Sequence, residues 1–327
     1  MICGFLSVMV CLLEFAAHAT LDKRPLAGIV YHIMKAQAAT NWLRAQLAGW
    51  RWIGALAAVA AMAWLALRGL PDGRLHVYFL EVGQGDAMLI QSPDGRQIMV
   101  DGGPSPTALL YELGDILPFW DRTLDLVILT HPDGDHITGL IPLLDRYQVV
   151  QVLDAAQSEA AAEAAPWRAR LAAAGIRRTF AQRGMSLPIG DLTLTVLNPG
   201  TRPLKGTTSD DNNNSTVLRL DYGATSLLLT ADAEAEAEAD MLAAGLLLRA
   251  DVLKVGHHGS QGATSARFVA AVAPRVAVIQ VGAENTFGHP SPEVLKRLAG
   301  VQVYRTDQQG RIEVVSDGKR MWVKTAR

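Results

Sequence analysis

The sequence predicts a mixed α/β domain over residues 75–327, preceded by an apolar N-terminal segment over 1–70. Three observations favour this organisation. Strand-length apolar runs outnumber helical stretches, which is too strand-rich for a simple alternating βα order. Of 327 residues, 50% are hydrophobic and 19% charged, which supplies a large core and argues against long disorder. A turn signal at 70–73 marks the point where the hydrophobic period changes.

The domain is expected to begin with short strands and to place its helices between the later ones. The apolar runs predict strands at 75–82, 87–91, 97–100, 124–129, 192–197, 216–220, 225–230, 251–255, 275–281, 301–305, 311–315 and 320–324. Helices are expected at 155–174, 232–249, 264–273 and 291–299. Gly175 and Gly300 are expected to end helices, and a turn over 316–319 to join the last two strands into a hairpin.

The N-terminal segment contains two apolar runs. Residues 52–67 carry no charge and lie between two arginines, and residues 2–19 carry one formal charge. A membrane span needs about 20 residues, fewer if flanking arginines reach the interface, so 52–67 is a predicted span and 2–19 a second candidate. The alternatives are a buried core helix or, for 2–19, a signal peptide. The signal peptide is disfavoured because no basic region precedes the run.

Charge bias predicts the orientation of this segment. The loop expected over 20–51 carries five lysines and arginines against one aspartate, which favours the cytoplasmic side. The chain would then cross the inner membrane at 52–67 and place the domain on the periplasmic or external side.

Composition limits the chemistry of the domain. Lys and Arg total 30 against 32 Asp and Glu, so a global basic coat for nucleic acid is excluded. The two cysteines, Cys3 and Cys11, both lie in the first apolar run. Any metal site in the domain must therefore use histidines and carboxylates.

Polar residues with ligand chemistry follow four of the predicted strands. The strand 124–129 leads to the hexad 131–136, and the strand 225–230 leads to Asp232 and Glu234. The strand 251–255 leads to the pair 257–258, and the strand 275–281 leads through a short loop to His289. Sites in layered α/β folds collect at strand ends, where rigid strands position loop residues. Five of the eight histidines lie in these loops, which predicts one common site.

The hexad carries four potential ligands in six residues, namely His131, Asp133, Asp135 and His136. The proline and glycine between them favour a turning loop, which can aim the side chains in two directions and suits two adjacent metal ions. A mixed His and carboxylate set is typical of Zn²⁺, Mn²⁺ or Fe. A divalent cation lowers the pKa of bound water to about 7, so no Ser or Cys nucleophile is required.

The later segments would complete such a site. Asp232 could bridge the two ions, and one of His257 and His258 could complete the second. Taken alone, Asp232 could instead cap the following helix, and His289 could merely shape the turn before Pro290. Nothing structural requires two His and two Asp within six residues, so metal binding is the better interpretation of the hexad.

In these motifs the chain resembles the metallo-β-lactamase superfamily. The hexad matches its H-x-[HD]-x-D-H signature. Within the superfamily the chain is similar to the C-terminal domain of ComEC-type DNA-uptake competence proteins, over about residues 75–315. The motifs that carry the resemblance follow in family order: Val82-Gly83-Gln84-Gly85-Asp86, Val100-Asp101-Gly102-Gly103, the hexad, Asn212-Asn213-Asn214-Ser215, Leu229-Thr230-Ala231-Asp232, Leu253 to Ser260, and Gly288-His289-Pro290.

The resemblance implies a four-layer αββα sandwich with the metal site at one edge of its two sheets, and implies that residues 1–70 are the end of a membrane channel region. It implies two divalent metal ions, Zn²⁺ or Mn²⁺, and a role for each candidate residue. The implied metal ligands are His131 and Asp133 for one ion, Asp135, His136 and His258 for the other, and Asp232 as the bridge. The implied catalytic residues are His257, Glu234 and His289, and Asp101 would brace the ligand loop. Ser260, Lys254 and Asn212 are candidate substrate contacts.

The function implied is a membrane-tethered, metal-dependent phosphodiesterase that hydrolyses DNA during uptake in natural transformation. Its expected partners are DNA, the membrane and other DNA-uptake proteins. One alternative is a hydrolase of another phosphodiester, such as a choline-phosphate ester. A second alternative is a non-catalytic DNA-binding module of a DNA channel. The second is motivated by the stretch 137–231, which lacks the further His that the superfamily usually has there.

Overall fold

The computed structural model describes residues 27–68 and 70–327, and the chain divides into two compact units with the boundary in the sequence after Arg68. In the first unit, the helix α2 (Ala27–Arg68) runs without interruption for 42 residues. It replaces the loop expected over 20–51 from residue 27 onward, because this stretch is rich in Ala, Leu and Gln, which are strong helix formers, and contains no proline.

The structure does not support the membrane span expected at 52–67. Within the part of the chain that is described, no helix combines the length and the apolar content needed to cross a membrane. The uncharged run covers only 16 residues between Arg51 and Arg68, whereas a span needs about 20. The other candidate, 2–19, lies outside the described residues.

The second unit contains two large β-sheets. The first sheet has eight strands in the order β17-β16-β1-β2-β3-β5-β7-β8, and the second has seven in the order β15-β14-β13-β12-β11-β10-β9. The first comprises β1 (Leu75–Phe79), β2 (Met88–Gln91), β3 (Gln97–Val100), β5 (Leu126–Ile128), β7 (Gln151–Asp154), β8 (Arg177–Phe180), β16 (Ile312–Ser316) and β17 (Met321–Thr325). The second comprises β9 (Ser186–Ile189), β10 (Leu192–Asn198), β11 (Val217–Tyr222), β12 (Thr225–Leu229), β13 (Val252–Lys254), β14 (Val276–Ile279) and β15 (Gln302–Arg305). A small parallel pair joins β4 (Thr123–Leu124) and β6 (Gln148–Val149).

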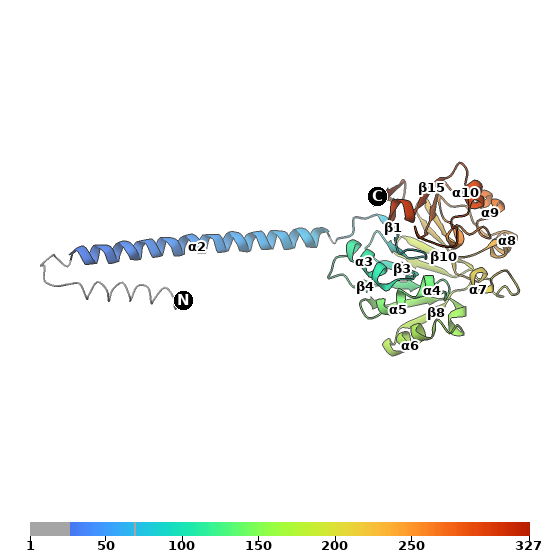
Figure 1. Ribbon diagram of the computed structural model, residues 1–327, viewed down its shortest axis with the longest axis horizontal. Coiled ribbons are helices and arrows are strands. Elements are labelled where there is room, and N and C mark those ends of the chain that lie inside the picture. Colours follow the sequence, from blue (N-terminus) through green and yellow to red (C-terminus); the bar gives the residue numbers. More distant parts are fainter. Residues whose placement is uncertain (1–26, 69) are drawn as a thin grey trace. The chain divides into compact units, whose positions relative to one another are not determined.

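The two sheets pack face to face, and helices cover their outer faces, so that the unit has four layers. Alternate side chains of β1, such as Val77 and Phe79, enter a core shared with Leu194 and Leu220 of the opposite sheet. On the outer face of the first sheet lie α3 (Pro106–Ile116), α5 (Leu140–Leu143) and α6 (Ala165–Ala174). On the outer face of the second sheet lie α8 (Ala235–Ala243), α9 (Ala266–Val272) and α10 (Pro292–Arg297). Figure 1 shows the two helix groups on opposite flanks, in green and in orange.

The structure confirms every predicted strand, with ends within three residues of those expected. The hairpin at 316–319 is present, with Ser316 paired to Met321. The helix expected over 155–174 is divided into a 3₁₀ turn, η1 (Ala156–Glu159), and α6, which ends at Gly175 in the left-handed conformation. Pro166 explains the late start of α6, because proline fits the first turn of a helix and disrupts its interior.

Candidate metal centre

The site lies where strands of both sheets end. β5 leads into the hexad loop and the short helix α4 (Gly134–Ile137), β12 leads to Asp232, and β13 leads to the 3₁₀ turn η2 (Gly256–Gly259). Because β12 and β13 are parallel neighbours, their carboxyl ends meet at one edge of the second sheet. Ala231, His257 and His258 all have left-handed backbone conformations, with φ of 46°, 44° and 51°. Such strained positions are typical of functional loops that the surrounding fold holds in place.

Four of the predicted ligands lie together. One ligand atom from each of Asp135, His136, Asp232 and His258 lies within 4.8 Å of the others. The Nε2 atoms of His136 and His258 lie 3.4 and 3.5 Å from the Asp232 carboxylate. The Nε2 atom of His258 also lies 3.3 Å from Oδ2 of Asp135. We call these four residues the ligand cluster.

His131 and Asp133 lie on another side of the Asp232 carboxylate. Nε2 of His131 lies 3.6 Å from Oδ2 of Asp133 and 4.0 Å from Oδ2 of Asp232. Oδ2 of Asp232 faces both His131 and His258, and Oδ1 faces His136. The Asp232 carboxylate therefore lies against residues of both predicted ligand groups.

The buried polar atoms of the site fit a metal. Nε2 of His131, His136 and His258 and Oδ1 of Asp232 are buried, and none has a hydrogen-bond partner among the described residues. Buried polar atoms without partners are costly and rare in folded proteins. Here they converge on one point from three separate loops, and imidazole nitrogen and carboxylate oxygen are ligand types that Zn²⁺ and Mn²⁺ accept.

Hydrogen bonds behind the site fix the direction of the His136 and His258 imidazoles. Nδ1 of His136 donates to Oδ2 of Asp101 over 2.9 Å, and the hydroxyl of Thr130 donates to the same oxygen over 2.6 Å. Nδ1 of His258 donates to the carbonyl oxygen of Gln280 over 3.0 Å. These bonds occupy Nδ1 and leave Nε2 facing the site, as is usual for metal-binding histidines. Asp101 thus braces the ligand loop.

Opposite charges determine the protonation of the ligand cluster. Burial raises the pKa of Asp232, but the positive charges of His258 and His136 outweigh it and hold the pKa well below its usual value. Burial lowers the pKa of His258, but the charges of Asp232 and Asp86 outweigh it and raise the pKa to about 10. Burial raises the pKa of Asp135, but its close contact with His258 and the charge of His136 outweigh burial and lower the pKa. The imidazoles therefore hold protons that a divalent cation would displace.

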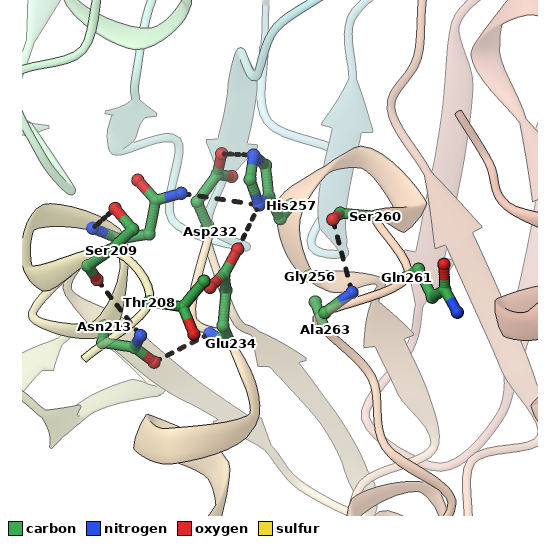
Figure 2. A network of polar contacts seen from close by, with 12 residues as sticks. Thr208, Ser209, Asn213, Asp232, Glu234, Gly256, His257, Ser260, Gln261 and Ala263 are labelled. Atoms are coloured by element: carbon green, nitrogen blue, oxygen red, sulfur yellow. Dashed lines mark hydrogen bonds and ion pairs between the residues drawn. The ribbon is translucent and has the colours of Figure 1, made fainter. Parts of the chain in front are cut away.

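Beside the ligand cluster, His257 lies between two carboxylates (Figure 2). Its Nδ1 donates to Oε1 of Glu234 over 2.9 Å, and its Nε2 lies 3.7 Å from Oδ2 of Asp232. The His257 side chain is 26% exposed, whereas His258 is buried. His257 is thus a partly exposed imidazole beside the ligand cluster, held by Glu234.

The segment 212–215 lies beside His257 and the start of α8. Asn213 accepts hydrogen bonds from the backbone of Glu234 and Ala237 at the start of α8, and Asn214 bonds the backbone of Leu204. The Asn212 amide instead lies 3.4 Å from Nδ1 of His257, and its Oδ1 is buried without a partner among the described residues. Asn212 is therefore the one asparagine of this motif that faces the site.

The remaining predicted residues are distributed differently. The His289 ring lies 5.7 Å from that of His257, and burial together with the charge of His257 lowers its pKa. Ser260 is half-buried at the end of η2. Lys254 is fully buried, and its Nζ contacts the Asp86 carboxylate and the carbonyl oxygen of Ala231. The assignment of Lys254 as a substrate contact was therefore wrong, because no part of its side chain reaches the surface.

Two residues with clear structural roles at the site received no role from the sequence. Asp86 lies behind the ligand cluster, with Oδ1 3.3 Å from Nδ1 of His258. Gln280 supplies the carbonyl oxygen that holds His258, and its side-chain amide bonds the carbonyl oxygens of Leu80 and Ala87 in the first sheet. The sequence did contain a signal for a role of Asp86 at the site, because Asp86 follows a strand in a glycine-rich turn and Asp232 also follows a strand.

Fold and site together define a metal-binding αββα sandwich. Residues 80–282, more than half of the chain, match the family model described as the Metallo-beta-lactamase superfamily, and the chain belongs to this superfamily. Among solved structures, it is similar to the metallo-beta-lactamase fold protein YhfI from Bacillus subtilis, with a TM-score of 0.50 and 16% identity over 76% of this chain and 100% of that chain. The structure thus confirms the sandwich predicted from the sequence.

Curated relatives give a more particular placement. The chain is 34% identical to ComE operon protein 3 of Bacillus subtilis over 73% of this chain, and 32% identical to Recombination protein 2 of Haemophilus influenzae over 80%. It is 29% identical to Competence protein ComA of Neisseria gonorrhoeae over 75%. The matches cover 32%, 32% and 33% of those proteins, so the chain spans about a third of the length of these relatives. These three relatives are consistent with the resemblance of the sequence motifs to ComEC-type proteins.

Proposed function

We propose that the 69–327 unit is a metal-dependent phosphodiesterase that cleaves DNA during its uptake. The observation that carries the hydrolytic part is the convergence of buried, unpartnered ligand atoms of His131, His136, His258 and Asp232. The DNA part is supported by the relatives named as competence and recombination proteins.

The chain's own residues supply the positioning and the proton chemistry. His131, Asp133, Asp135, His136 and His258 would hold two divalent cations, Zn²⁺ or Mn²⁺, with Asp232 between them. When bound, such a pair supplies a water of lowered pKa and a clamp for the oxygens of a phosphodiester. Asp101, Thr130 and Gln280 keep the imidazoles oriented toward that position.

His257 would face the reacting phosphate from the open side of the site. Its Nδ1–H bond to Glu234 fixes the orientation of the ring and leaves Nε2 turned toward Asp232. From this position Nε2 can stabilise charge on the phosphate or donate a proton to the leaving oxygen. His289, whose lowered pKa favours a neutral ring, would accept rather than supply a proton.

A single assay tests the proposal. Full-length chain is incubated with labelled DNA and Mn²⁺, Zn²⁺ or Mg²⁺, with a chelator as control. Asp135→Asn is expected to slow cleavage by at least about 100-fold while leaving folding nearly intact, since loss of a direct ligand should cost no less than loss of a supporting contact. Asp191→Asn, an exposed carboxylate in the β9–β10 turn, is the matched control. Cleavage at the wild-type rate by Asp135→Asn would exclude the mechanism.

The assay also separates the alternatives. Hydrolysis of bis(p-nitrophenyl) phosphate without cleavage of DNA would favour a hydrolase of another phosphodiester, such as a choline-phosphate ester. Metal-independent DNA binding without hydrolysis would favour a non-catalytic module. The buried, unpartnered ligand atoms favour the enzyme over that module, because a binding surface does not require them.

The cellular location is a further proposal. A role in uptake places the 69–327 unit on the external side of the inner membrane, together with other DNA-uptake proteins. Protease treatment of intact spheroplasts is expected to digest this unit. Protection from the protease would place it in the cytoplasm instead.

A further inference from the structure

The loop that follows β14 reaches from the metal centre to the surface and is held in one conformation. The Asn285 side chain closes it, because Nδ2 donates to the carbonyl oxygens of Gly282 and His289 over 2.8 and 2.9 Å. Oδ1 of Asn285 accepts from the backbone N–H of His289 over 3.0 Å. The amide of Gly282 is bonded to the Gln84 side chain. The loop is thus fixed at both ends and braced in the middle.

An exposed aromatic ring lies on this loop. The Phe287 side chain is 69% exposed, although an apolar ring gains stability by burial. A single exposed apolar residue is ordinary on a protein surface and would require no explanation by itself. Its neighbours make Phe287 unusual, since its ring is stacked on that of His289, with centroids 5.8 Å apart and planes inclined by 25°.

The stacked pair continues as a row of rings that leads to the metal centre. The His289 ring lies 5.7 Å from that of His257, and the His257 ring lies 6.0 Å from that of His258 in the ligand cluster. Nε2 of His257 is 3.7 Å from the Asp232 carboxylate. Phe287 is the outer, solvent-exposed end of this row, and His258 is its buried inner end.

We propose that Phe287 stacks against a nucleobase next to the scissile phosphate and makes the site selective for single-stranded nucleic acid. This inference rests on the proposed phosphodiesterase function. A polynucleotide alternates phosphates with flat aromatic bases, so a phosphate at the cations leaves a neighbouring base to be held outside the site. Exposed aromatic rings bind such bases by stacking without regard to sequence. The bases of a duplex are already stacked and paired, which denies them to Phe287.

The test compares two ligands that differ only in their bases. Binding of fluorescent oligo(dT)₁₂ and of a twelve-unit abasic oligomer is measured by anisotropy with the metal-loaded full chain, and both oligomers carry cleavage-resistant phosphorothioate linkages so that nothing is cleaved. Phe287→Ala is expected to weaken oligo(dT)₁₂ binding about tenfold and to leave abasic binding unchanged, because stacking on one base gives an effect of this order. Phe287→Trp should retain the wild-type affinity.

A matched control is available on the same unit. Phe119 is exposed to a similar degree, 76%, but its ring neighbour is Trp120 and it takes no part in the row of rings. Phe119→Ala should therefore bind both ligands as the wild type does. Equal losses on the two ligands in Phe287→Ala, or no loss on either, would overturn the inference.

Cleavage assays distinguish failure of this inference from failure of the proposed function. With metal present, Phe287→Ala is expected to raise KM for oligo(dT)₁₂ about tenfold and leave kcat unchanged, and to leave the kinetics on the abasic oligomer unaltered. If the wild type cleaves neither oligomer, the phosphodiesterase proposal fails, while the binding comparison still decides the stacking inference. A base-dependent loss in Phe287→Ala supports stacking in either case.

Discussion

Replacement of Lys254 should show how strongly the core beneath the metal centre depends on one buried cation. Its Nζ contacts the Asp86 carboxylate and donates to the carbonyl oxygen of Ala231 over 2.9 Å. Both charged side chains have no exposed surface. In Lys254→Met the aliphatic stem is retained, but Asp86 loses its ammonium partner and keeps only the His258 ring, and removing one partner of a buried pair typically costs about 3–5 kcal/mol of unfolding free energy.

A double-mutant cycle isolates the charge effect from the loss of packing. Lys254→Met, Asp86→Asn and the double variant are unfolded in urea with chelator present, and near-UV circular dichroism reports on buried Trp167. Because the double variant leaves no unpaired charge, we expect a coupling energy of about 2–3 kcal/mol. Lys324→Met is the control, since its ion pair with Glu313 is exposed on the lysine side and is worth at most about 1 kcal/mol. Additive losses in the two single variants would refute the ion pair as the source of the effect.

Three further changes have expected outcomes that depend on different parts of the structure. Burial lowers the pKa of His76, but its hydrogen bonds to two carboxylates outweigh it and raise the pKa. A group whose pKa is raised by folding stabilises the folded state at pH values below its unfolded-state pKa, and this stabilisation is lost as pH rises through its folded-state pKa. His76→Gln should therefore lower the free energy of unfolding in urea by about 1 kcal/mol at pH 6 and by less at pH 9. Gly139→Ala should lower stability by at least about 1–3 kcal/mol in thermal unfolding, since the added Cβ would lie 1.9 Å from a backbone carbonyl oxygen. Gly114→Ala in α3 is the control, because its Cβ would have no tertiary neighbour within 4 Å, and it should raise stability by up to about 1 kcal/mol. Asp101→Ala frees Nδ1 of His136 and should weaken metal affinity about 10- to 100-fold in a calorimetric titration, while unchanged affinity would deny it a bracing role.

Periodicity was sufficient for most of the sandwich because its strands have one face toward the core. In β1 burial alternates along Leu75–Phe79, as the sequence pattern indicates. β8 was not predicted, since Arg177–Phe180 lies at the edge of its sheet, is largely exposed and has no apolar alternation. The helix α3 was also overlooked, although Ser105 and Pro106 form an N-terminal signal that the structure uses, with the serine side chain accepting from Ala108.

The positions of the ligands at strand ends predicted that the ligand loops converge, but the sequence did not predict the buried contacts behind the ligand cluster. Parallel neighbours such as β12 and β13 place Asp232 and His258 at one edge, which the sequence order already suggested. The role of Lys254 depends on β13 being central and covered on both faces, so that all three of its residues are buried. Sequence alternation cannot show this, because the partner, Asp86, lies 168 residues earlier, between β1 and β2 of the first sheet.

Metal stoichiometry tests the site most directly. Full-length chain, stripped by chelator and titrated calorimetrically with Zn²⁺ or Mn²⁺, should take up two ions per chain, and Asp232→Asn should lose tight binding of both because its carboxylate lies between the two ligand groups. Asp191→Asn should titrate as the wild type does. A wild-type chain that binds neither ion, or an Asp232→Asn variant that binds both with unchanged affinity, would contradict a metal centre at this edge of the sandwich.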